Sequence, residues 1–495
     1  MDAADHANAD SVFRAAIVAF NQGLMEEALA LAQRGVAAHP DDPRLWQALG
    51  LAHRGLEDMG PAIEAFATAA RLAPSDALIA HSLARSTLEG GLPAVGLFDR
   101  AVRLAPNDGS VMLGRAAAEL AEGRIDQAID GLERVLAAHS GWVEGHETVA
   151  RLRWTRGERR TFAGSFETAL RGTPRDIAIW SGLITTLIGA ERYDDAQAAV
   201  SRARAAVGSD SAFDAFEVIC VAERGETEAA DRLFAALGPI SDIDLVVRLV
   251  RHLLRSGRPA EAAATAEAHL GEETGDALWP YLSAVWRLVG DPRWQWLEGD
   301  DRFVGVYDIG DKVGPLVRLA ERLRALHVTS HAPLDQTVRG GTQTDGPLFS
   351  RLEPEIRALR QAIVTAVEAH VAQLPAHDPR HPLLREKRAP IRFSGSWSVR
   401  LKGAGYHVNH VHPAGWISSA FYVALPDSHM GGADHAGWLS LGEVSELGLD
   451  LPPTRLIEPK PGRLVLFPSI MWHGTRPFPE GERLTVAFDV GRPPR

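Results

Sequence analysis

The stretch DPRLWQALGLAHRGLEDMGPAIEAFATAARLAP (Asp42–Pro74) contains the pattern that decides the fold of the first half of the chain. A residue that ends a helix recurs at separations of 34, 32, 34, 34 and 34 residues, at Pro40, Pro74, Pro106, Ser140, Pro174 and Gly208. Alanine recurs in step with it, at Ala28, Ala62, Ala94, Ala128, Ala196 and Ala230. A period of this length predicts a stack of helix–turn–helix units.

A bulky or aliphatic residue lies four positions after the alanine in most units, at Phe66, Phe98, Leu132, Phe166, Val200 and Phe234. Spacings of three and four place these residues on one helix face. The pattern resembles the tetratricopeptide repeat, which implies about seven units between Ser11 and Leu270, two of them degenerate. A closing helix is expected at Ala277–Gly290. Such arrays have a concave face that binds an extended peptide or a protein, although the array could instead serve dimerisation or shielding.

Composition limits the classes of partner and site. The chain has 495 residues, a net charge of −12 and a single cysteine. This charge argues against nucleic acid or an anionic membrane as partner, and one cysteine excludes an internal disulfide or a cysteine-rich metal site. The first residues lack the features of a secretory signal, and no run of about 18 apolar residues occurs. We therefore expect a soluble, cytoplasmic protein whose oligomeric state is left open.

The character of the sequence changes near residue 290. We predict a disordered terminus at 1–10, the repeat array at 11–290, a connector at 291–312 and a second domain at 313–495. In the second domain we expect helices at Val313–His327 and 352–374, separated by a glycine- and threonine-rich loop at Val338–Gly346. Short segments rich in Val, Leu, Phe, Trp and Thr follow, and they predict strands at 394–401, 415–426, 437–443, 462–469 and 482–490. Strands at this spacing favour a β-sandwich or barrel.

Histidines gather where these strands are expected. The segment YHVNHVHP contains His407, His410 and His412, and residues two apart in a strand point to the same face. His473 follows at the end of another predicted strand, and Arg483 comes ten residues later. Two imidazoles on one strand face can share a metal ion, so His410 and His412 are candidate ligands, whereas His407 is given no role.

The segments VRGGTQT, NHVHPAGWISSAFYVALP and PGRLVLFPSIMWHGTRPF together resemble a prokaryotic branch of the Fe(II)- and 2-oxoglutarate-dependent oxygenases. The resemblance covers roughly Asp301–Arg495, and members of that branch often carry tetratricopeptide repeats in front. It implies a double-stranded β-helix, also called a jelly roll, that uses Fe(II), 2-oxoglutarate and O2. It also implies that His410 and His473 bind iron and that Arg483 holds the far carboxylate of 2-oxoglutarate, helped by Thr485. Tyr422 is a further candidate, because its hydroxyl could donate a hydrogen bond to a carboxylate. No catalytic residue is expected beyond these ligands.

The chain departs from the usual His-x-Asp or His-x-Glu motif of that superfamily at His412. His412 could be the third ligand, which is the option we favour. It could instead contact the metal ligands without binding the metal, which would leave a two-histidine site completed by water. Alternatively, a carboxylate could come from elsewhere, with Asp427 and Glu443 as the nearest candidates.

The predicted glycine-rich loop contains four polar residues: Arg339, Thr342, Gln343 and Thr344. They could line a substrate or co-substrate pocket, or the loop could be a simple glycine turn.

Four functions follow from these observations. The first is an oxygenase that hydroxylates a protein or peptide docked by the repeats, and the second acts on a small molecule and uses the repeats for assembly. The third is a scaffold whose jelly roll binds metal without turnover, and the fourth is a cupin-like metalloenzyme with three histidines. Arg483 argues against the fourth, because it has no obvious use there.

Overall fold

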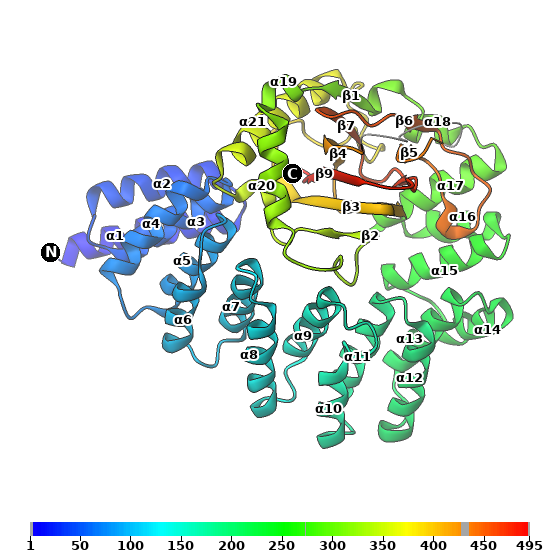
Figure 1. Ribbon diagram of the computed structural model, residues 1–495, viewed down its shortest axis with the longest axis horizontal. Helices are drawn as coiled ribbons and strands as arrows, with labels where there is room; N and C mark the ends of the chain where they lie inside the picture. The colour runs from blue at the N-terminus through cyan, green and yellow to red at the C-terminus, as the bar shows by residue number, and fades with distance from the viewer. Residues whose placement is uncertain (1–2, 273, 427–434, 494–495) are drawn as a thin grey trace. The chain divides into compact units, whose positions relative to one another are not determined.

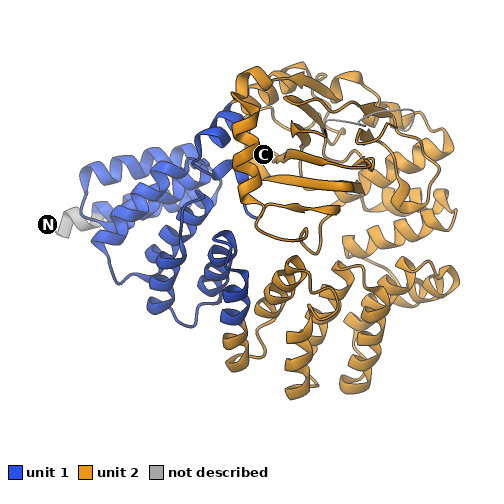
Figure 2. Cartoon of the chain, in the orientation of Figure 1, with its two compact units in different colours: residues 1–132, 345–361, 494 blue, residues 133–344, 362–493, 495 orange. Residues whose placement is uncertain are grey.

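The computed structural model describes residues 3–272, 274–426 and 435–493. The chain divides into two compact units (Figure 2). Unit 1 contains the helices up to Leu132 together with Asp345–Gln361, and unit 2 contains residues 133–344 and 362–493. The division does not fall at the predicted boundary at residue 290, because the later repeat helices pack with the sheet.

The front part of the chain is helical. In the described residues up to His269, sixteen α-helices follow one another as antiparallel pairs of the tetratricopeptide type (Figure 1). The helices are α1 (Ala3–Asn21), α2 (Met25–Ala38), α3 (Pro43–Gly55), α4 (Met59–Leu72), α5 (Ala77–Glu89), α6 (Val95–Leu104), α7 (Gly109–Ala121), α8 (Ile125–Ala138), α9 (Val143–Arg156), α10 (Gly164–Gly172), α11 (Ile177–Gly189), α12 (Tyr193–Val207), α13 (Ser211–Glu223), α14 (Thr227–Leu237), α15 (Ile243–Arg255) and α16 (Pro259–His269). Residues 3–10, which we predicted to be disordered, belong to α1.

Aspartate begins the first helix of most repeats. One set of side chains accepts a hydrogen bond from the backbone N–H two or three residues later: Asp42, Asp76, Asp108, Asp176, Asp210 and Asp242. Each cap of this kind stabilises a helix by about 1 kcal/mol. The helix that starts after Trp142 has no side-chain cap, and the same repeat has Phe162 where the recurring alanine is expected. This unit therefore lacks both the aspartate cap and the recurring alanine.

The recurring aromatic residue packs against a glycine of a neighbouring helix. A Cβ atom on Gly50 would lie 2.8 Å from the Phe66 ring, and one on Gly114 would lie 2.3 Å from the Phe98 ring. Both phenylalanines are fully buried. Because a β-carbon would collide with the ring, these helices approach as closely as they do only where glycine occupies the position.

The remaining helices join the array to a sheet. They are η1 (Gly275–Leu278), α17 (Trp279–Val289), α18 (Arg293–Glu298), η2 (Asp301–Phe303), α19 (Gly310–Val313), α20 (Leu316–Leu326), η3 (Leu348–Ser350), α21 (Pro354–Gln373) and η4 (Ser445–Leu447). The expected closing helix is α17, and the two helices expected in the second domain are α20 and α21. The predicted connector is more than a link, because it contains α18 and a strand, β1 (Gly305–Asp308).

The sheet has nine antiparallel strands in the order β1-β7-β4-β9-β3-β8-β5-β6, with β2 paired to β3. Its other strands are β2 (Val338–Gln343), β3 (Phe393–His410), β4 (Ile417–Ala424), β5 (Leu439–Leu441), β6 (Arg455–Ile457), β7 (Arg463–Pro468), β8 (His473–Thr475) and β9 (Glu482–Val490). The prediction of a loop at Val338–Gly346 is wrong, because most of this segment forms strand β2. Pairing with β3 overrides the local turn preference of its glycines.

Strand β3 pairs with β9 along Phe393–Lys402, and it pairs with β8 through His407 and His410. Between these two stretches its register is interrupted, and Ala404 has a φ of 60°. A bulge of this kind turns a strand. One strand therefore serves both halves of the sheet, which curls into the expected double-stranded β-helix.

The last repeat helices share a hydrophobic core with the sheet. Val250, Leu282 and Val285 from α15 and α17 pack with Val444 and Trp472 from the sheet side. The Trp472 indole N–H donates a hydrogen bond to the carbonyl oxygen of Pro280 over 3.0 Å. Separating α17 from the sheet would expose this core to water.

Among the described residues, no helix combines the length and the apolar character needed to cross a bilayer.

An ion cluster ties α13 to α15 inside the array. Glu223, whose side chain is 4% exposed, contacts Arg248, Arg251 and Arg255 at 2.5, 3.1 and 2.5 Å. Burial acts to raise the pKa of Glu223, but the three guanidinium groups outweigh it and lower this pKa to about 2 from 4.5. Because the folded-state pKa is depressed, the cluster stabilises the fold above pH 4.5 and loses this effect as the pH falls toward 2.

We expect Glu223→Gln to lower the free energy of unfolding at pH 7 by about 3 kcal/mol, since three arginines lose their buried partner. Urea unfolding followed by circular dichroism measures this change. The difference from the native chain should shrink between pH 4.5 and 2. Glu228→Gln on the exposed face of α14 is the matched control, and equal midpoints for the two variants would show that the cluster is not stabilising.

Candidate metal centre

Three histidines meet where β3 and β8 come together. His410 ends β3 and His473 begins β8, and the register places the two directly opposite each other. His412 follows two residues after β3. One ring nitrogen of each residue lies within 4.8 Å of those of the other two, and the rings of His410 and His473 are 4.2 Å apart between centroids. We call His410, His412 and His473 the histidine trio.

The Nδ1 atom of every member of the trio faces a hydrogen-bond acceptor. The acceptors are the Val408 carbonyl oxygen for His410 (2.8 Å), the Met471 carbonyl oxygen for His473 (3.0 Å) and the Asp489 carboxylate for His412 (2.9 Å). Because carbonyl and carboxylate oxygens accept hydrogen bonds, each Nδ1 carries the proton. The lone pair of each ring is then on Nε2, which is the arrangement found in metal-binding histidines.

Burial favours the neutral form of His410 and His473. It lowers the pKa of His410 to about 3, and the nearby His412 adds to this effect. Burial and the other histidines likewise hold the pKa of His473 well below its usual range. Neutral imidazole is the form that binds a metal ion, so the donor set fits a divalent cation with a preference for nitrogen ligands.

Asp489 orients His412, and sequence reasoning missed it. Its carboxylate accepts hydrogen bonds from His412 Nδ1 and from the Ser418 hydroxyl, at 2.9 and 2.6 Å. Asp489 lies on β9, six residues beyond Arg483 and on the same face. An aspartate at even spacing from Arg483, after the largely apolar segment Val486–Phe488, was the available signal.

His407 was given no role in the sequence, yet it lies beside the trio. Its ring is stacked on that of His410 with 6.0 Å between centroids. The Thr337 hydroxyl lies 3.4 Å from His407 Nδ1 and 3.5 Å from His410 Nε2. Thr337 therefore covers one side of the candidate metal centre.

Arg483 is a buried cation without an anionic partner. It is 2% exposed, and none of the ion pairs among the described residues includes it. Its guanidinium carbon lies 5.1 Å from the centre of the Tyr422 ring, and the two polar groups are close without meeting the geometry of a hydrogen bond. Burial lowers the pKa of Arg483 and raises that of Tyr422.

Thr485 shares the strand face of Arg483 and pairs across the sheet with Tyr422. It is 5% exposed. A buried guanidinium beside a tyrosine and a threonine hydroxyl has the composition of a carboxylate-binding site. The structure thus brings together the three residues that the sequence proposed for the co-substrate.

The polar residues of β2 separate into two groups. Arg339 and Thr342 line a cavity, and Thr342 Oγ1 lies 2.8 Å from His327 Nδ1. Thr344 is buried and accepts a hydrogen bond from the Ser398 N–H, while the Gln343 amide donates to Gln336 over 3.4 Å. Their roles remain predictions.

The two carboxylates considered as metal ligands have different outcomes. Asp427 lies outside the described residues. Glu443 accepts a hydrogen bond from the Ser440 hydroxyl over 2.5 Å and does not belong to the metal-compatible group, which in the described part of the chain contains the trio alone.

Comparison with known families agrees with this geometry. Residues 395–489 match the family model described as "Putative 2OG-Fe(II) oxygenase", and residues 13–77 and 83–141 match the tetratricopeptide repeat. The chain therefore contains tetratricopeptide repeats and a segment at 395–489 that is similar to this family. The trio, Arg483 and Asp489 all lie within the matched range of the oxygenase domain.

Several solved structures are similar to the repeat part. MamA from Desulfovibrio magneticus is 17% identical with a TM-score of 0.30, covering 33% of this chain and 93% of that chain. YrrB, titled a TPR protein with an unusual peptide-binding site, is 17% identical with a TM-score of 0.28, covering 33% and 86%. A thermophilic TPR protein from Thermus thermophilus is 20% identical with a TM-score of 0.28, covering 36% and 99%. Among curated proteins, none matches the sequence.

We expect Asp489→Asn to weaken binding of Fe(II) or Co(II) by about tenfold or more, because the amide no longer carries the charge that holds the His412 imidazole. Anaerobic titration with Co(II), followed by its visible absorption, measures the affinity. Asp308→Asn on the exposed strand β1 is the matched control. Unchanged affinity in Asp489→Asn would show that His412 does not depend on this carboxylate.

Proposed function

We propose that this chain is an Fe(II)- and 2-oxoglutarate-dependent oxygenase that hydroxylates a polypeptide substrate docked by its repeat array. The observation that carries the proposal is Arg483, a buried arginine without an anionic partner among the described residues, on the strand whose Asp489 orients His412. A buried unpaired charge is costly, so a fold that retains one has a use for it. The two carboxylates of 2-oxoglutarate give it a partner.

The proposal assigns one group of residues to the metal ion and another to 2-oxoglutarate. His410, His412 and His473 would bind Fe(II) through Nε2, while Val408, Asp489 and Met471 keep the proton on Nδ1. Arg483, Tyr422 and Thr485 would bind the far carboxylate of 2-oxoglutarate. When bound, Fe(II) would supply activation of O2 with 2-oxoglutarate as the co-reductant, so that one oxygen atom would enter succinate as CO2 leaves and the other would convert a substrate C–H bond into C–OH.

Three neutral ligands leave the charge of Fe(II) uncompensated within the ligand set. We infer that Asp489 supplies that charge through the imidazole of His412, in place of the carboxylate that usually binds iron directly in this superfamily. In this proposal, the repeats bind a protein or peptide partner. A cytoplasmic location is part of the proposal, since burial raises the pKa of the single thiol, Cys220, to about 11 and the fold needs no disulfide.

The deciding experiment is an anaerobic titration with Fe(II) and then 2-oxoglutarate. We expect a weak visible charge-transfer band when both are present, and succinate after O2 is admitted. Arg483→Ala should weaken 2-oxoglutarate binding by at least about tenfold, because a charge-assisted pair is lost, while Fe(II) remains bound. Arg318→Ala on the exposed face of α20 is the control. A chain that gives no band and no succinate is not an oxygenase of this kind.

His412 has its own test. We expect His412→Asp to lower Fe(II) affinity by at least about tenfold, because the new carboxylate would lie beside Asp489 and like charges repel. The double variant His412→Asp with Asp489→Asn removes one of the two carboxylates and should recover part of the affinity. Fe(II) titration of the native chain, both single variants and the double variant gives the coupling. If His412→Asp binds Fe(II) as tightly as the native chain, the coupling between residues 412 and 489 does not exist.

A further inference from the structure

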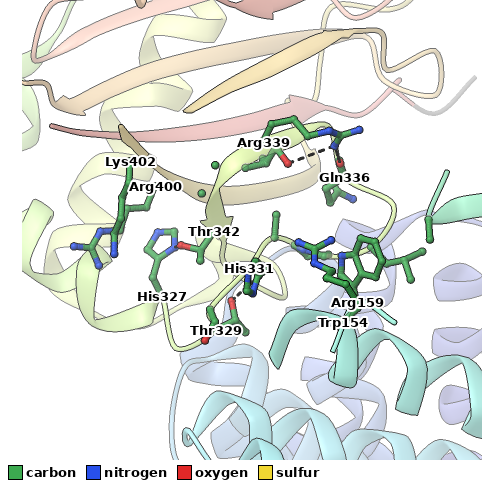
Figure 3. Close-up of a pocket in the computed structure, with 18 of the residues that line it drawn as sticks. Trp154, Arg159, His327, Thr329, His331, Gln336, Arg339, Thr342, Arg400 and Lys402 are labelled. Atoms are coloured by element: carbon green, nitrogen blue, oxygen red, sulfur yellow. Dashed lines mark hydrogen bonds between the residues drawn. The ribbon is translucent and has the colours of Figure 1, made fainter. Parts of the chain in front are cut away.

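A cavity of about 770 Å³ lies inside unit 2, between the repeat helices and the edge of the sheet (Figure 3). On the repeat side it is lined by Trp154 in the last turn of α9, by Arg159 just after that helix, and by Ala190 and Glu191 between α11 and α12. On the sheet side it is lined by the segment 327–342 and by Arg400 and Lys402 of β3. Its volume is in the range of sites that bind ligands larger than a single small ion.

Positive charge dominates this cavity although the chain as a whole has a net charge of −12. Four lining residues are cationic, Arg159, Arg339, Arg400 and Lys402, and one is a carboxylate, Glu191. Arg339 pairs with Glu191 at 2.7 Å, and Arg400 pairs with Glu482 at 2.5 Å. Arg159 and Lys402 have no carboxylate partner among the described residues.

Arg159 is held in place by an aromatic ring. Its guanidinium carbon lies 3.8 Å from the centre of the Trp154 ring, a cation–π contact that fixes the side chain without neutralising it. Burial lowers the pKa of Arg159, and the positive charge of Arg339 adds to this effect. The cavity therefore holds cations that repel one another, which an incoming anion would relieve.

The two cations without a carboxylate partner lie on opposite sides of the residues that line the cavity. Figure 3 shows Arg400 and Lys402 on one side, Trp154 and Arg159 on the other, and His327 and His331 between them. The Nδ1 atom of His331 is buried and has no hydrogen-bond partner among the described residues. Burial lowers the pKa of His327 to about 4, so its ring is neutral and adds no charge of its own.

One wall of the cavity is the free edge of a strand. Strand β2 pairs with β3 alone among the described strands, and Gly340 and Gly341 present its backbone to the cavity. An extended peptide can pair with such an edge, and the cations on each side can then bind its acidic side chains.

The same wall separates the cavity from the candidate metal centre. Gln336 and Val338 line the cavity, and Thr337 between them contacts His407 and His410. A polypeptide along this edge would lie one strand segment away from the trio.

From these observations we propose that the cavity binds an acidic, extended segment of a polypeptide substrate, with Arg159 and Lys402 pairing with its carboxylates. The inference rests on the proposed oxygenase function and specifies the class of substrate that the repeats present. Peptide binding at the cavity is measurable without turnover, so it can fail or succeed independently of the oxygenase reaction.

The test uses the full chain and two fluorescent twelve-residue probes, one with glutamate at alternate positions and one with glutamine in its place. We expect the glutamate peptide to raise fluorescence anisotropy with an affinity that falls as salt increases, because the ionic contacts are partly exposed. The glutamine peptide should bind at least about tenfold more weakly. Equal binding of both peptides would overturn the proposal.

Charge reversal locates the site. Arg159→Glu and Lys402→Glu should each weaken binding of the glutamate peptide by at least about tenfold, since each replaces an attraction by a repulsion. Arg160→Glu changes the neighbouring exposed arginine, which does not line the cavity, and is the matched control. Co(II) titration of the trio should give the same affinity in all three variants. Loss of binding in Arg160→Glu equal to that in Arg159→Glu would place the interaction elsewhere.

Two further probes distinguish binding of an acidic polypeptide from binding of a small anion or a nucleic acid. Free glutamate at the same carboxylate concentration should not displace the peptide, because it cannot pair along the β2 edge. A single-stranded oligonucleotide should bind more weakly than the glutamate peptide. Displacement by free glutamate, or tighter binding of the oligonucleotide, would contradict the polypeptide assignment.

Discussion

The double pairing of strand β3 is the constraint on which the candidate site depends. Its first stretch is bonded to β9 and its last residues are bonded to β8, so one continuous segment belongs to both halves of the sheet. The bulge between Leu401 and Tyr406 is what allows this. Because β3 turns there, His410 arrives opposite His473, and His412 arrives beside the Asp489 carboxylate of β9. A straight strand would leave these groups on separate faces.

Strand β9 is the second part of this arrangement. Arg483, Thr485 and Asp489 share one face through the two-residue period of the strand. Under the proposed function, the same strand would thus provide the cation that binds the co-substrate and the anion that orients a metal ligand. Five residues of the strand separate these two opposite charges, so under the proposed function each would serve a different bound group. Register is critical here, since a slip of one residue would turn all three side chains to the other face.

Much of this site was predictable from local sequence. The two-residue period places His410 and His412 together. The similarity of the surrounding sequence to a known family points to His473, Arg483 and Thr485 as candidate site residues. What escaped prediction depends on contacts between distant segments. Asp489 becomes important only once β9 lies beneath His412, and Thr337 only once Val338 pairs with His407. Strands β1, β6 and β8 have three or four residues and carry too little pattern to be recognised. The repeat array was predictable because its period repeats many times, whereas its boundary with the sheet was not, since apolar faces of α15 and α17 serve both parts.

Trp472 shows what that shared core means for the molecule as a whole. Its indole donates to the Pro280 carbonyl oxygen, its ring meets Tyr281 edge-on, and the residue that follows it in the chain is His473. A candidate metal ligand is therefore one peptide bond from a side chain anchored in the last helix of the array. The array and the sheet share one hydrophobic core, so they are not independent domains. A substitute array would have to reproduce the surface of α17 that packs against Val444, Ile470 and Trp472.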